Sequence, residues 1–331
     1  MMKLPGWTRF EEEGIIQVKI ALASPLRWVN SYIVPGDDGI TVVDAGLHTP
    51  AAVESWEHVL KELNWSAKDI TRILITHHHP DHYGLAGWLQ ERSGASVLMS
   101  ARSLQEARFM WGEEGVTVER LVRFFRAHGL PQELSMPMRE HLNESYREVL
   151  PQPSVTCVNE GDSLLMGGRV WKLIMTGGHA PGHLSLYQRD SEIIMCGDAV
   201  LPQISPNVSL LPGSDAHPLA AYMDGLRKLG QYEVRQAFPG HRHPFGHFRD
   251  RTVHLLEHHE ERLNRCAQLL DEQPRNAYEL SIAMYGDKLT VHQLRFALSE
   301  TLAHLDELMI RGQAVEQAED RCTAYVAASK E

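Results

Sequence analysis

The segment THHHPDH, residues 76–82, directly follows DITRILI, residues 69–75, which predicts a buried strand. Alternate side chains of an extended segment point the same way, so His77 and His79 could hold one cation together. Asp81 and His82 lie one step further along and could reach a second cation. Imidazole nitrogens and carboxylate oxygens are ligands that zinc-like ions bind in proteins. The alternative is a polar loop in which histidines occur by chance.

Three more histidine or aspartate sites occur where a strand should meet a glycine-rich turn. They are GGHAPGH at residues 177–183, Gly197-Asp198, and Pro239-Gly240-His241. Glycine lets the backbone bend sharply around a crowded centre. The chain has 19 histidines, and they gather in such groups rather than scattering. These matching contexts favour metal chemistry over the chance-loop alternative.

Strands and helices alternate along the chain in two blocks, which predicts an α/β fold with two sheets sandwiched between helices over residues 1–272. Residues 101–150 interrupt this pattern and predict an insert of two or three helices. The expected strand-rich blocks are residues 15–46 and 153–200, with further strands at residues 95–100 and just before Pro239. The expected helices include residues 50–63, 215–229 and 249–272.

Residues 273–331 predict a separate unit of two amphipathic helices and a terminal hairpin, which is typical of a small winged-helix-like module. Winged helices often bind nucleic acid. Residues 276–331, however, carry five Lys or Arg against nine Asp or Glu. This acidic balance argues against nucleic-acid binding, because phosphate contacts need basic side chains. We expect the module to pack on the first domain or to close one side of a pocket.

Composition sets the broad class of the protein. The 331 residues are 43% hydrophobic, which suffices for a core, and the formal net charge is −11. The four cysteines form no CxxC pair and indicate a reducing compartment. The chain has no apolar run of about 18 residues and no apolar segment near its start, so we expect no membrane partner and a cytoplasmic location.

The order of these motifs resembles the five motifs of the metallo-β-lactamase superfamily over residues 15–250. The matching positions are Asp44, His77-x-His79-x-Asp81-His82, His183, Asp198 and His241. The strings GHLSLY, CGDAVLPQISPNVSL and PGHRHPFGHFRDR are similar to a bacterial subgroup related to the glyoxalase II and lactonase branches. That subgroup carries a winged-helix-like C-terminal module. The resemblance implies an αββα sandwich with metals at one edge of the two sheets.

The resemblance implies a site for two divalent metal ions, with zinc as the expected identity and iron or manganese as alternatives. Asp198 would bridge the two ions, and Asp44 would orient the ligand loop. His179 would hold a ligand in position or touch the substrate. The implied ligands are His77, His79 and His183 for the first ion, and Asp81, His82 and His241 for the second.

The implied activity is hydrolysis of a thioester, ester or lactone carbonyl of a small molecule by metal-bound hydroxide, with Asp81 and Asp198 as catalytic residues. The β-lactam-degrading branches lack a bridging aspartate at position 198, so we expect no β-lactamase activity. A phosphoester or organophosphate hydrolase is the first alternative, since two-metal centres also serve phosphoryl transfer. A mononuclear iron sulfur dioxygenase, and a non-catalytic or nucleic-acid-binding protein on this scaffold, are further alternatives.

The helical insert is the expected selectivity element. Trp111 and Phe124 are candidate substrate contacts, and Tyr187 could hydrogen-bond the substrate near the metals. The alternative role of the insert is an ordinary helical core, and the same residues could also form a homodimer contact. Its expected apolar wall consists of Met110, Trp111, Phe124, Phe125, Met136 and Met138, and its expected anion contacts are Arg120, Arg123 and Arg126.

Overall fold

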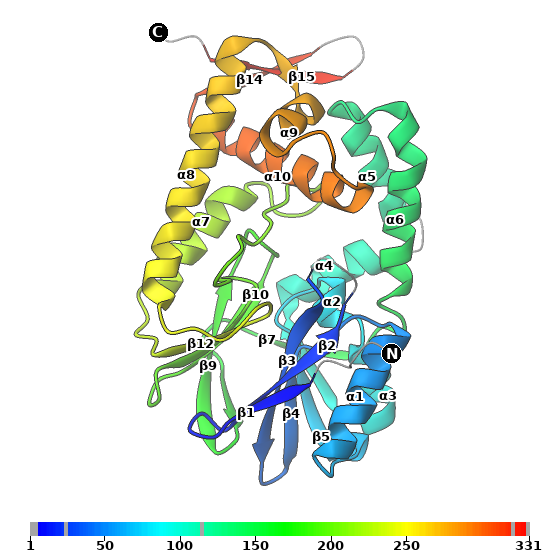
Figure 1. The fold of residues 1–331 in the computed structure, drawn as a ribbon, viewed down its shortest axis with the longest axis vertical. Helices are drawn as coiled ribbons and strands as arrows, with labels where there is room; N and C mark the ends of the chain where they lie inside the picture. Colours follow the sequence, from blue (N-terminus) through cyan, green and yellow to red (C-terminus); the bar gives the residue numbers. More distant parts are fainter. Residues whose placement is uncertain (1–5, 23–25, 113–115, 319–321, 329–331) are drawn as a thin grey trace.

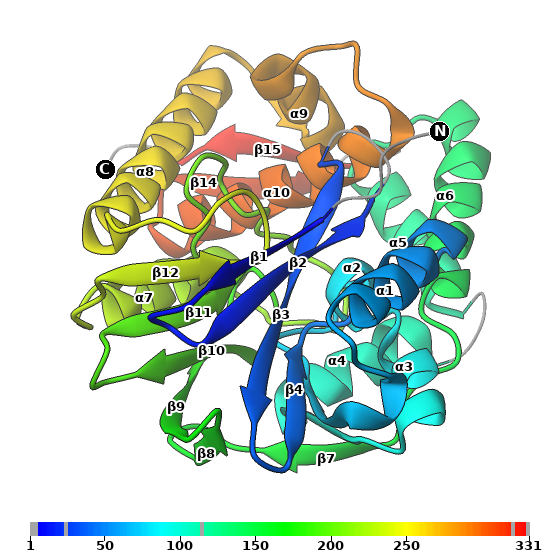
Figure 2. The ribbon, with the colours of Figure 1, turned by 60° about the horizontal axis from the view of Figure 1, so that its bottom comes forward.

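Two β-sheets stack face to face in the structure, a computed structural model that describes residues 6–22, 26–112, 116–318 and 322–328 (Figure 2). Within these residues the larger sheet has seven strands in chain order, antiparallel up to the fourth and parallel from there on. The strands are β1 (Trp7–Phe10), β2 (Ile15–Ala21), β3 (Trp28–Gly36), β4 (Gly39–Val43), β5 (Ile70–Leu74), β6 (Ser96–Ser100) and β7 (Val155–Val158).

The smaller sheet has five strands in the described part of the chain, in the order β12-β11-β10-β9-β8. β12 pairs in parallel with β11, and the other pairs are antiparallel. The strands are β8 (Ser163–Met166), β9 (Arg169–Thr176), β10 (His183–Gln188), β11 (Ile193–Gly197) and β12 (Gln236–Pro239). The short β1 is the strand that the sequence analysis did not predict in these two sheets.

The core between the sheets is built from side chains of both inner faces. β10 and β11 are buried along their whole length, and the sequence of β11, IIMCG, is a continuous apolar run, as is usual for a strand buried on both faces. Other buried members come from the opposite sheet, so the two sheets interlock through side chains. The core includes Tyr32, Val43, Leu74, Leu98, Trp171, Leu186, Met195 and Phe238.

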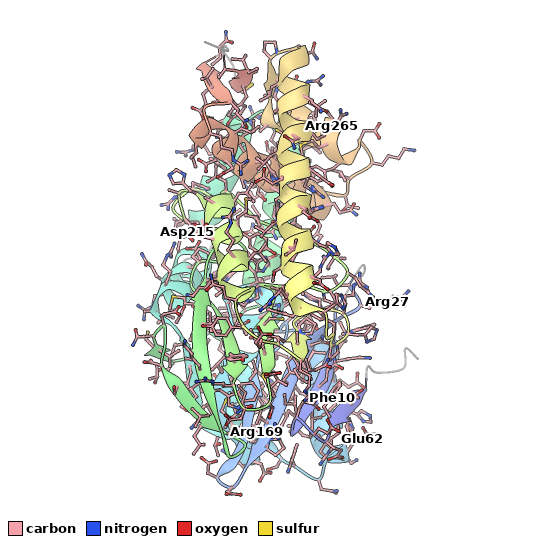
Figure 3. The ribbon with its side chains drawn as sticks, turned by 90° about the vertical axis from the view of Figure 1, so that its left-hand side faces the viewer. Phe10, Arg27, Glu62, Arg169, Asp215 and Arg265 are labelled. Carbon is pink, nitrogen blue, oxygen red and sulfur yellow. The ribbon has the colours of Figure 1, made fainter. Side chains whose placement is uncertain are left out.

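Helices cover the outer faces, as an αββα sandwich requires. α1 (Pro50–Glu62), α3 (Ala86–Ser93) and α4 (Ala101–Trp111) pack on the larger sheet (Figure 2). α7 (Pro218–Leu229) packs on the smaller sheet, and α8 (Phe248–Glu272) packs on α7. Figure 3 shows α8 running from the sheets to the far end of the molecule, where it carries Arg265. The predicted α/β sandwich is therefore confirmed.

The insert predicted at residues 101–150 contains α4, α5 (Val116–Ala127) and α6 (Ser135–Arg147), together with the short 3₁₀ helix η2 (Gln132–Leu134). The buried positions of α5 recur at helical spacing, so one face of this helix packs inward. α10 (Val291–Ile310), from the C-terminal part of the chain, lies against α6 (Figure 1). The insert and the C-terminal helices thus meet above the sheets.

The C-terminal part contains β13 (Arg275–Asn276), α9 (Ala277–Tyr285), α10, β14 (Ala314–Ala318) and β15 (Thr323–Ala327). The two predicted helices and the terminal hairpin are present, and β13, which was not predicted, pairs with β15 to complete a small sheet. Capping boxes at Asn276 and Thr290 explain where α9 and α10 begin. The boundary after residue 272 and the winged-helix class stay predictions.

The remaining elements are short. The 3₁₀ helix η1 (Ala67–Asp69) precedes β5, and α2 (Pro80–Tyr83) is a single turn that carries part of the segment of residues 76–82. No helix in the described ranges is long and apolar enough to cross a membrane. The expected cytoplasmic location stays a prediction.

Candidate metal centre

The predicted metal-binding segments meet at one edge of the sandwich, beyond the carboxyl ends of several strands. Residues 75–79 follow β5, and α2 continues directly from them. His179 lies in the turn between β9 and β10, Asp198 follows β11, and His241 follows β12. The carboxyl ends of parallel neighbours meet at the same sheet edge, so segments far apart in sequence come together here.

One cluster holds three histidines. The Nε2 atom of His77 lies 3.0 Å from Nδ1 of His79 and 3.3 Å from Nε2 of His179. Nitrogens bound to one tetrahedral zinc ion, at about 2.0–2.1 Å each, lie about 3.3 Å apart. These two distances match that spacing, and one ligand nitrogen from each of the three histidines lies within 4.8 Å of the other two.

His183 lies beside this cluster and makes a different contact. Its Nε2 accepts a hydrogen bond from the backbone N–H of Asp198, at 3.1 Å. Its ring stacks on His77, with 4.9 Å between ring centroids. The expected triad of His77, His79 and His183 is thus not the one that the structure brings together, because His179 takes the third position.

A second cluster contains Asp81, His82 and His241. Nε2 of His241 lies 3.1 Å from Oδ2 of Asp81, and Nε2 of His82 lies 3.8 Å from the same oxygen. These are the three side chains that the resemblance to the metallo-β-lactamase superfamily implied for a second ion. They are buried except for Asp81, whose side chain is 24% exposed.

Asp198 lies between the two clusters. Its Oδ2 is 3.3 Å from Nε2 of His241 and 3.8 Å from Nε2 of His179, while its Oδ1 is 3.5 Å from Nε2 of His82. One carboxylate therefore faces histidines of both groups, which is the position that a bridging ligand needs.

The ring nitrogen that does not face the clusters is held by a protein oxygen in four of these histidines. Such a contact fixes the ring orientation and, where the ring donates, leaves the other nitrogen free to bind a metal. The four contacts are His77 with the Thr76 hydroxyl at 2.9 Å, His82 with Asp44 at 2.8 Å, His179 with the Asn207 carbonyl at 2.8 Å, and His241 with the Trp28 carbonyl at 3.4 Å.

Asp44 organises the ligand segment. Its carboxylate accepts hydrogen bonds from the backbone N–H and the hydroxyl of Thr76, at 2.8 and 2.9 Å, as well as contacting His82. It is buried, and its φ of +61° lies in the left-handed region that non-glycine residues seldom adopt. Backbone strain at a buried polar residue is typical of functional sites.

Gly240 makes room for the two clusters. A Cβ atom at this position would lie 2.1 Å from Oδ1 of Asp198 and 2.6 Å from Cε1 of His82. Real Cβ atoms do not come so close, so any other residue would displace the carboxylate or the ring. This is the crowding that the glycine-rich turns indicated.

Electrostatics separates the two groups of histidines. Burial, followed by repulsion from neighbouring histidines, holds the pKa of His77 and His79 well below the ordinary value, so their rings are neutral and can donate lone pairs. Burial also acts to lower the pKa of His241, but Asp198 and Asp81 outweigh it and raise that pKa to about 10. His241 therefore lies against two carboxylates, Asp198 and Asp81, and both carboxylates would also attract a metal cation.

The donor set fits a divalent metal pair. Nε2 of His82 and Oδ1 of Asp198 are buried without a hydrogen-bond partner, although they are strongly polar. Unpartnered buried polar atoms are costly unless a ligand satisfies them. The two atoms lie 3.5 Å apart, and a cation bound by both would satisfy them.

A pocket of about 90 Å³ adjoins the clusters. Trp111 lines it, as predicted for a substrate contact, and donates a hydrogen bond to the His78 carbonyl at 3.0 Å. Phe124 does not line it, because the next residue on α5, Phe125, faces the pocket instead. The described residues that line the pocket are His78, His79, Pro80, Asp81, Met110, Trp111, Leu121, Phe125, Ser209, Leu211, Arg295, Phe296 and Ser299.

Tyr187 does not reach the pocket. It lies four residues beyond His183 along β10, or about 13 Å at the usual rise per residue. Its hydroxyl donates to the backbone carbonyl of Glu233, at 2.9 Å, and its ring packs on Tyr232. The prediction that it contacts the substrate is wrong.

The predicted wall of the insert is only partly correct. Met110, Trp111 and Phe125 line the pocket, whereas Met138 is buried in the core and Met136 is exposed.

The three arginines expected to meet an anion do not line the pocket either. Arg120 and Arg123 are exposed, and Arg126 is only partly exposed. The sequence analysis missed Arg295 on α10, which does line the pocket.

Another group with metal-ligand residue types lies away from the pocket, between α8 and α10. His259, Glu300 and His304 are buried there. Nδ1 of His259 lies 3.3 Å from Nε2 of His304, and Glu300 is 3.3 Å from the Arg262 guanidinium. Since Arg262 already supplies a positive charge to the carboxylate, we interpret this group as a buried polar network.

Comparison with known families identifies the class of protein. Residues 26–241 match the metallo-beta-lactamase superfamily, and residues 263–328 match the metallo-beta-lactamase-like C-terminal domain. The chain therefore belongs to the metallo-β-lactamase superfamily of hydrolases, which bind divalent metals.

Curated relatives agree with this assignment. The probable metallo-hydrolase YqjP of Bacillus subtilis is 25% identical over 322 residues, which are 95% of each chain. The hydroxyacylglutathione hydrolase of Idiomarina loihiensis is 26% identical over 163 residues, which are 49% of this chain and 42% of that relative. The specific glyoxalase II or lactonase branch stays a prediction.

Solved structures extend the similarity to the whole chain. A metallo-beta-lactamase family protein from Thermus thermophilus matches with a TM-score of 0.85 and 32% identity, covering 95% of this chain and 99% of that one. A beta-lactamase domain protein from Burkholderia ambifaria matches with a TM-score of 0.84 and 29% identity, covering 95% and 92%. The predicted metallo-β-lactamase fold is confirmed.

Proposed function

We propose that this protein is a hydrolase with two divalent metal ions that cleaves a thioester, ester or lactone bond in a small molecule. The observation that carries the proposal is the pair of histidine and aspartate clusters that share Asp198. A single buried carboxylate facing both groups has a simple chemical role in a two-metal centre and none in a structural loop.

The ligand assignment follows the contacts. His77, His79 and His179 would hold one ion, and Asp198 would bridge to the other. His183 would act as a positioning residue, because it accepts the backbone N–H of Asp198 and packs on His77. The second ion would be held by Asp81, His82 and His241, as the sequence indicated. Zinc is our preferred identity, since imidazole and carboxylate ligands suit it.

When bound, two divalent ions lower the pKa of water towards neutrality and polarise a carbonyl oxygen. The protein residues would do the rest. Asp81 lines the pocket and is partly exposed, so its carboxylate could orient a water molecule and accept its proton. Trp111 and Phe125 would exclude bulk water from the reacting bond.

Carbonyl chemistry is favoured over phosphoryl transfer by the relatives. The hydroxyacylglutathione hydrolase of Idiomarina loihiensis is named for a thioester substrate. The acidic C-terminal part argues against an RNA substrate, because few basic side chains would meet the phosphates.

The test is an assay of the purified protein with three probes: an N-acetylcysteamine thioester, a homoserine lactone and a phosphotriester. We expect the thioester or the lactone to be hydrolysed, the activity to disappear with a chelator, and zinc to restore it. Asp198→Ala should abolish turnover, whereas Asp190→Ala, on an exposed turn, should not change it. Turnover of the phosphotriester alone, or full activity in Asp198→Ala, would overturn the proposal.

A further inference from the structure

Arg295 brings a positive charge into the pocket from the C-terminal part of the chain. It lies on α10 and lines the pocket together with His79, Pro80 and Asp81. In the described ranges its side chain has no hydrogen bond and no ion pair, and its Nε is buried without a partner. Its guanidinium stacks on the ring of Phe296, with 4.2 Å to the ring centroid.

The surroundings of Arg295 do not neutralise it. Burial lowers its pKa to about 10, against the attraction of Asp81, so the guanidinium stays charged at neutral pH. Asp81 is the only carboxylate that lines the pocket among the described residues, and it already faces His241 and His82. A partly buried cation without a counter-charge is costly, and an anionic ligand would remove that cost.

Two histidines, one on α10 and one on α6, lie close enough to Arg295 for its charge to affect their pKa values. His292 on α10 and His141 on α6 lie next to each other, with 3.3 Å between Nδ1 of His292 and Nε2 of His141. The charge on Arg295 contributes to lowering the pKa of both, after the larger effect of burial. Both rings are neutral at pH 7, so Arg295 is the charge that an anion would meet.

The rest of the pocket wall is mainly apolar. Met110, Trp111, Leu121 and Phe125 come from the insert, and Phe296 comes from α10. This arrangement suits a molecule with an apolar body, a cleavable bond near the metal ligands and an anionic group near α10.

We propose that Arg295 binds an anionic group of the substrate, a carboxylate or a phosphate, so that the preferred substrates are acidic thioesters or esters. The inference rests on the proposed function, whose substrate class it narrows. A guanidinium presents paired N–H donors that match the oxygens of either anion, whereas a lysine would offer only a point charge. The C-terminal part would thus supply specificity to a centre built by the sheets.

The experiment compares two thioesters of N-acetylcysteamine, one with glutarate and one with pentanoate, which differ in a terminal carboxylate. We expect Arg295→Gln to lower the glutarate-to-pentanoate ratio of kcat/KM at least tenfold, mainly through KM for the glutarate compound. Arg295→Lys should give an intermediate ratio. Arg265→Gln, an exposed arginine far along α8 (Figure 3), should keep the wild-type ratio.

Two kinetic results would overturn the inference. One is a ratio in Arg295→Gln within twofold of the wild type. The other is an equal fall in Arg265→Gln, which would indicate a general charge effect. Competition with glutarate and with inorganic phosphate identifies the anion, because inhibition by the matching one should weaken at least tenfold in Arg295→Gln.

A separate binding measurement keeps the two proposals apart. If the wild type hydrolyses neither thioester, glutarate and phosphate are titrated calorimetrically into the metal-loaded protein. The proposed function itself fails only if the lactone is not hydrolysed either. Binding that is lost in Arg295→Gln and kept in Arg265→Gln would support the anion site independently. Equal binding by all three proteins, or none, would overturn it.

Discussion

At the scale of single residues, Asp44 shows how the protein prepares a ligand before any metal arrives. Its carboxylate contacts both Thr76 and His82, so one side chain fixes the entry of the ligand segment and the orientation of a ligand ring. Its positive φ persists because these contacts outweigh the local backbone cost of about 1–3 kcal/mol.

Asp44→Asn tests this role. The amide keeps the size of the side chain but loses the charge that faces His82. We expect metal affinity to fall about 10–100-fold, as is usual when a partner of a ligand ring is changed. Competition with a fluorescent chelator measures the affinity. Asp190→Asn, on an exposed turn, is the matched control, and an unchanged affinity in Asp44→Asn would contradict the role.

A second prediction for single residues is that His179, and not His183, is a metal ligand. His179→Ala should reduce the metal content from about two ions to about one per chain, because it removes a ligand. His183→Ala should retain about two ions. Metal analysis by inductively coupled plasma mass spectrometry distinguishes them. If His183→Ala loses an ion and His179→Ala does not, our ligand assignment is reversed.

Much of the site could be predicted from the spacing of residues in the sequence alone. The predictions that were wrong have physical causes. The segment of residues 76–82 and the turns with Asp198 and His241 do converge. His179 and His183 share one glycine-rich loop, and the sequence did not show which ring turns towards His77. Phe124 and Phe125 are adjacent on a helix, about 100° apart, so only the packing of α5 decides which one faces the pocket.

At the scale of elements, apolar runs located most strands of both sheets. β1 was missed because it has only four residues, none of them buried, and β13 because it has two. Such short pieces become strands through pairing with a neighbour rather than through their own pattern. The α10 helix was predicted, but its contact with α6 depends on the whole arrangement.

The interface of α8 and α10 predicts a pH dependence of stability. Burial lowers the pKa of His304 to about 4, against about 6.5 for an unfolded histidine. Below pH 6.5 the unfolded chain gains a proton that the folded chain does not, so stability falls as the pH drops towards 4. At pH 5 this one residue should cost about 2 kcal/mol relative to pH 7.

Urea unfolding at pH 7 and pH 5 checks this expectation. His304→Gln should lose about 2 kcal/mol less than the wild type between the two pH values. The comparison removes contributions that both proteins share, including those of the metal ligands. His254→Gln, an exposed histidine on α8, should behave as the wild type. A loss in His304→Gln equal to that of the wild type would rule out a pH-dependent role for His304.

At the scale of the whole molecule, three distant parts of the chain build the pocket. The loops at the sheet edge supply the metal ligands, the insert supplies apolar side chains, and α10 supplies Arg295. The sequence predicted that the C-terminal part would pack on the first domain or close one side of a pocket, but no local pattern indicates that α10 is the helix that lines it. The long-range packing that brings it there is what the sequence analysis could not provide.

Because the ligands come from both sheets, metal binding should stabilise the entire fold. At a free metal concentration of 100 times Kd, binding adds about 2.7 kcal/mol of stability per site. We therefore expect a chelator to lower Tm by about 5–10 °C in a thermal unfolding experiment. Asp198→Ala should show a much smaller shift, and an equal shift in both proteins would contradict a shared site.

Native mass spectrometry of the purified chain tests the central claim most directly, because it counts the ions held by each folded molecule. We expect a dominant species with two divalent ions per chain, and loss of one or both ions in Asp198→Ala. A wild-type chain that holds no divalent ion after incubation with zinc, or that holds the same number in Asp198→Ala, would contradict that claim.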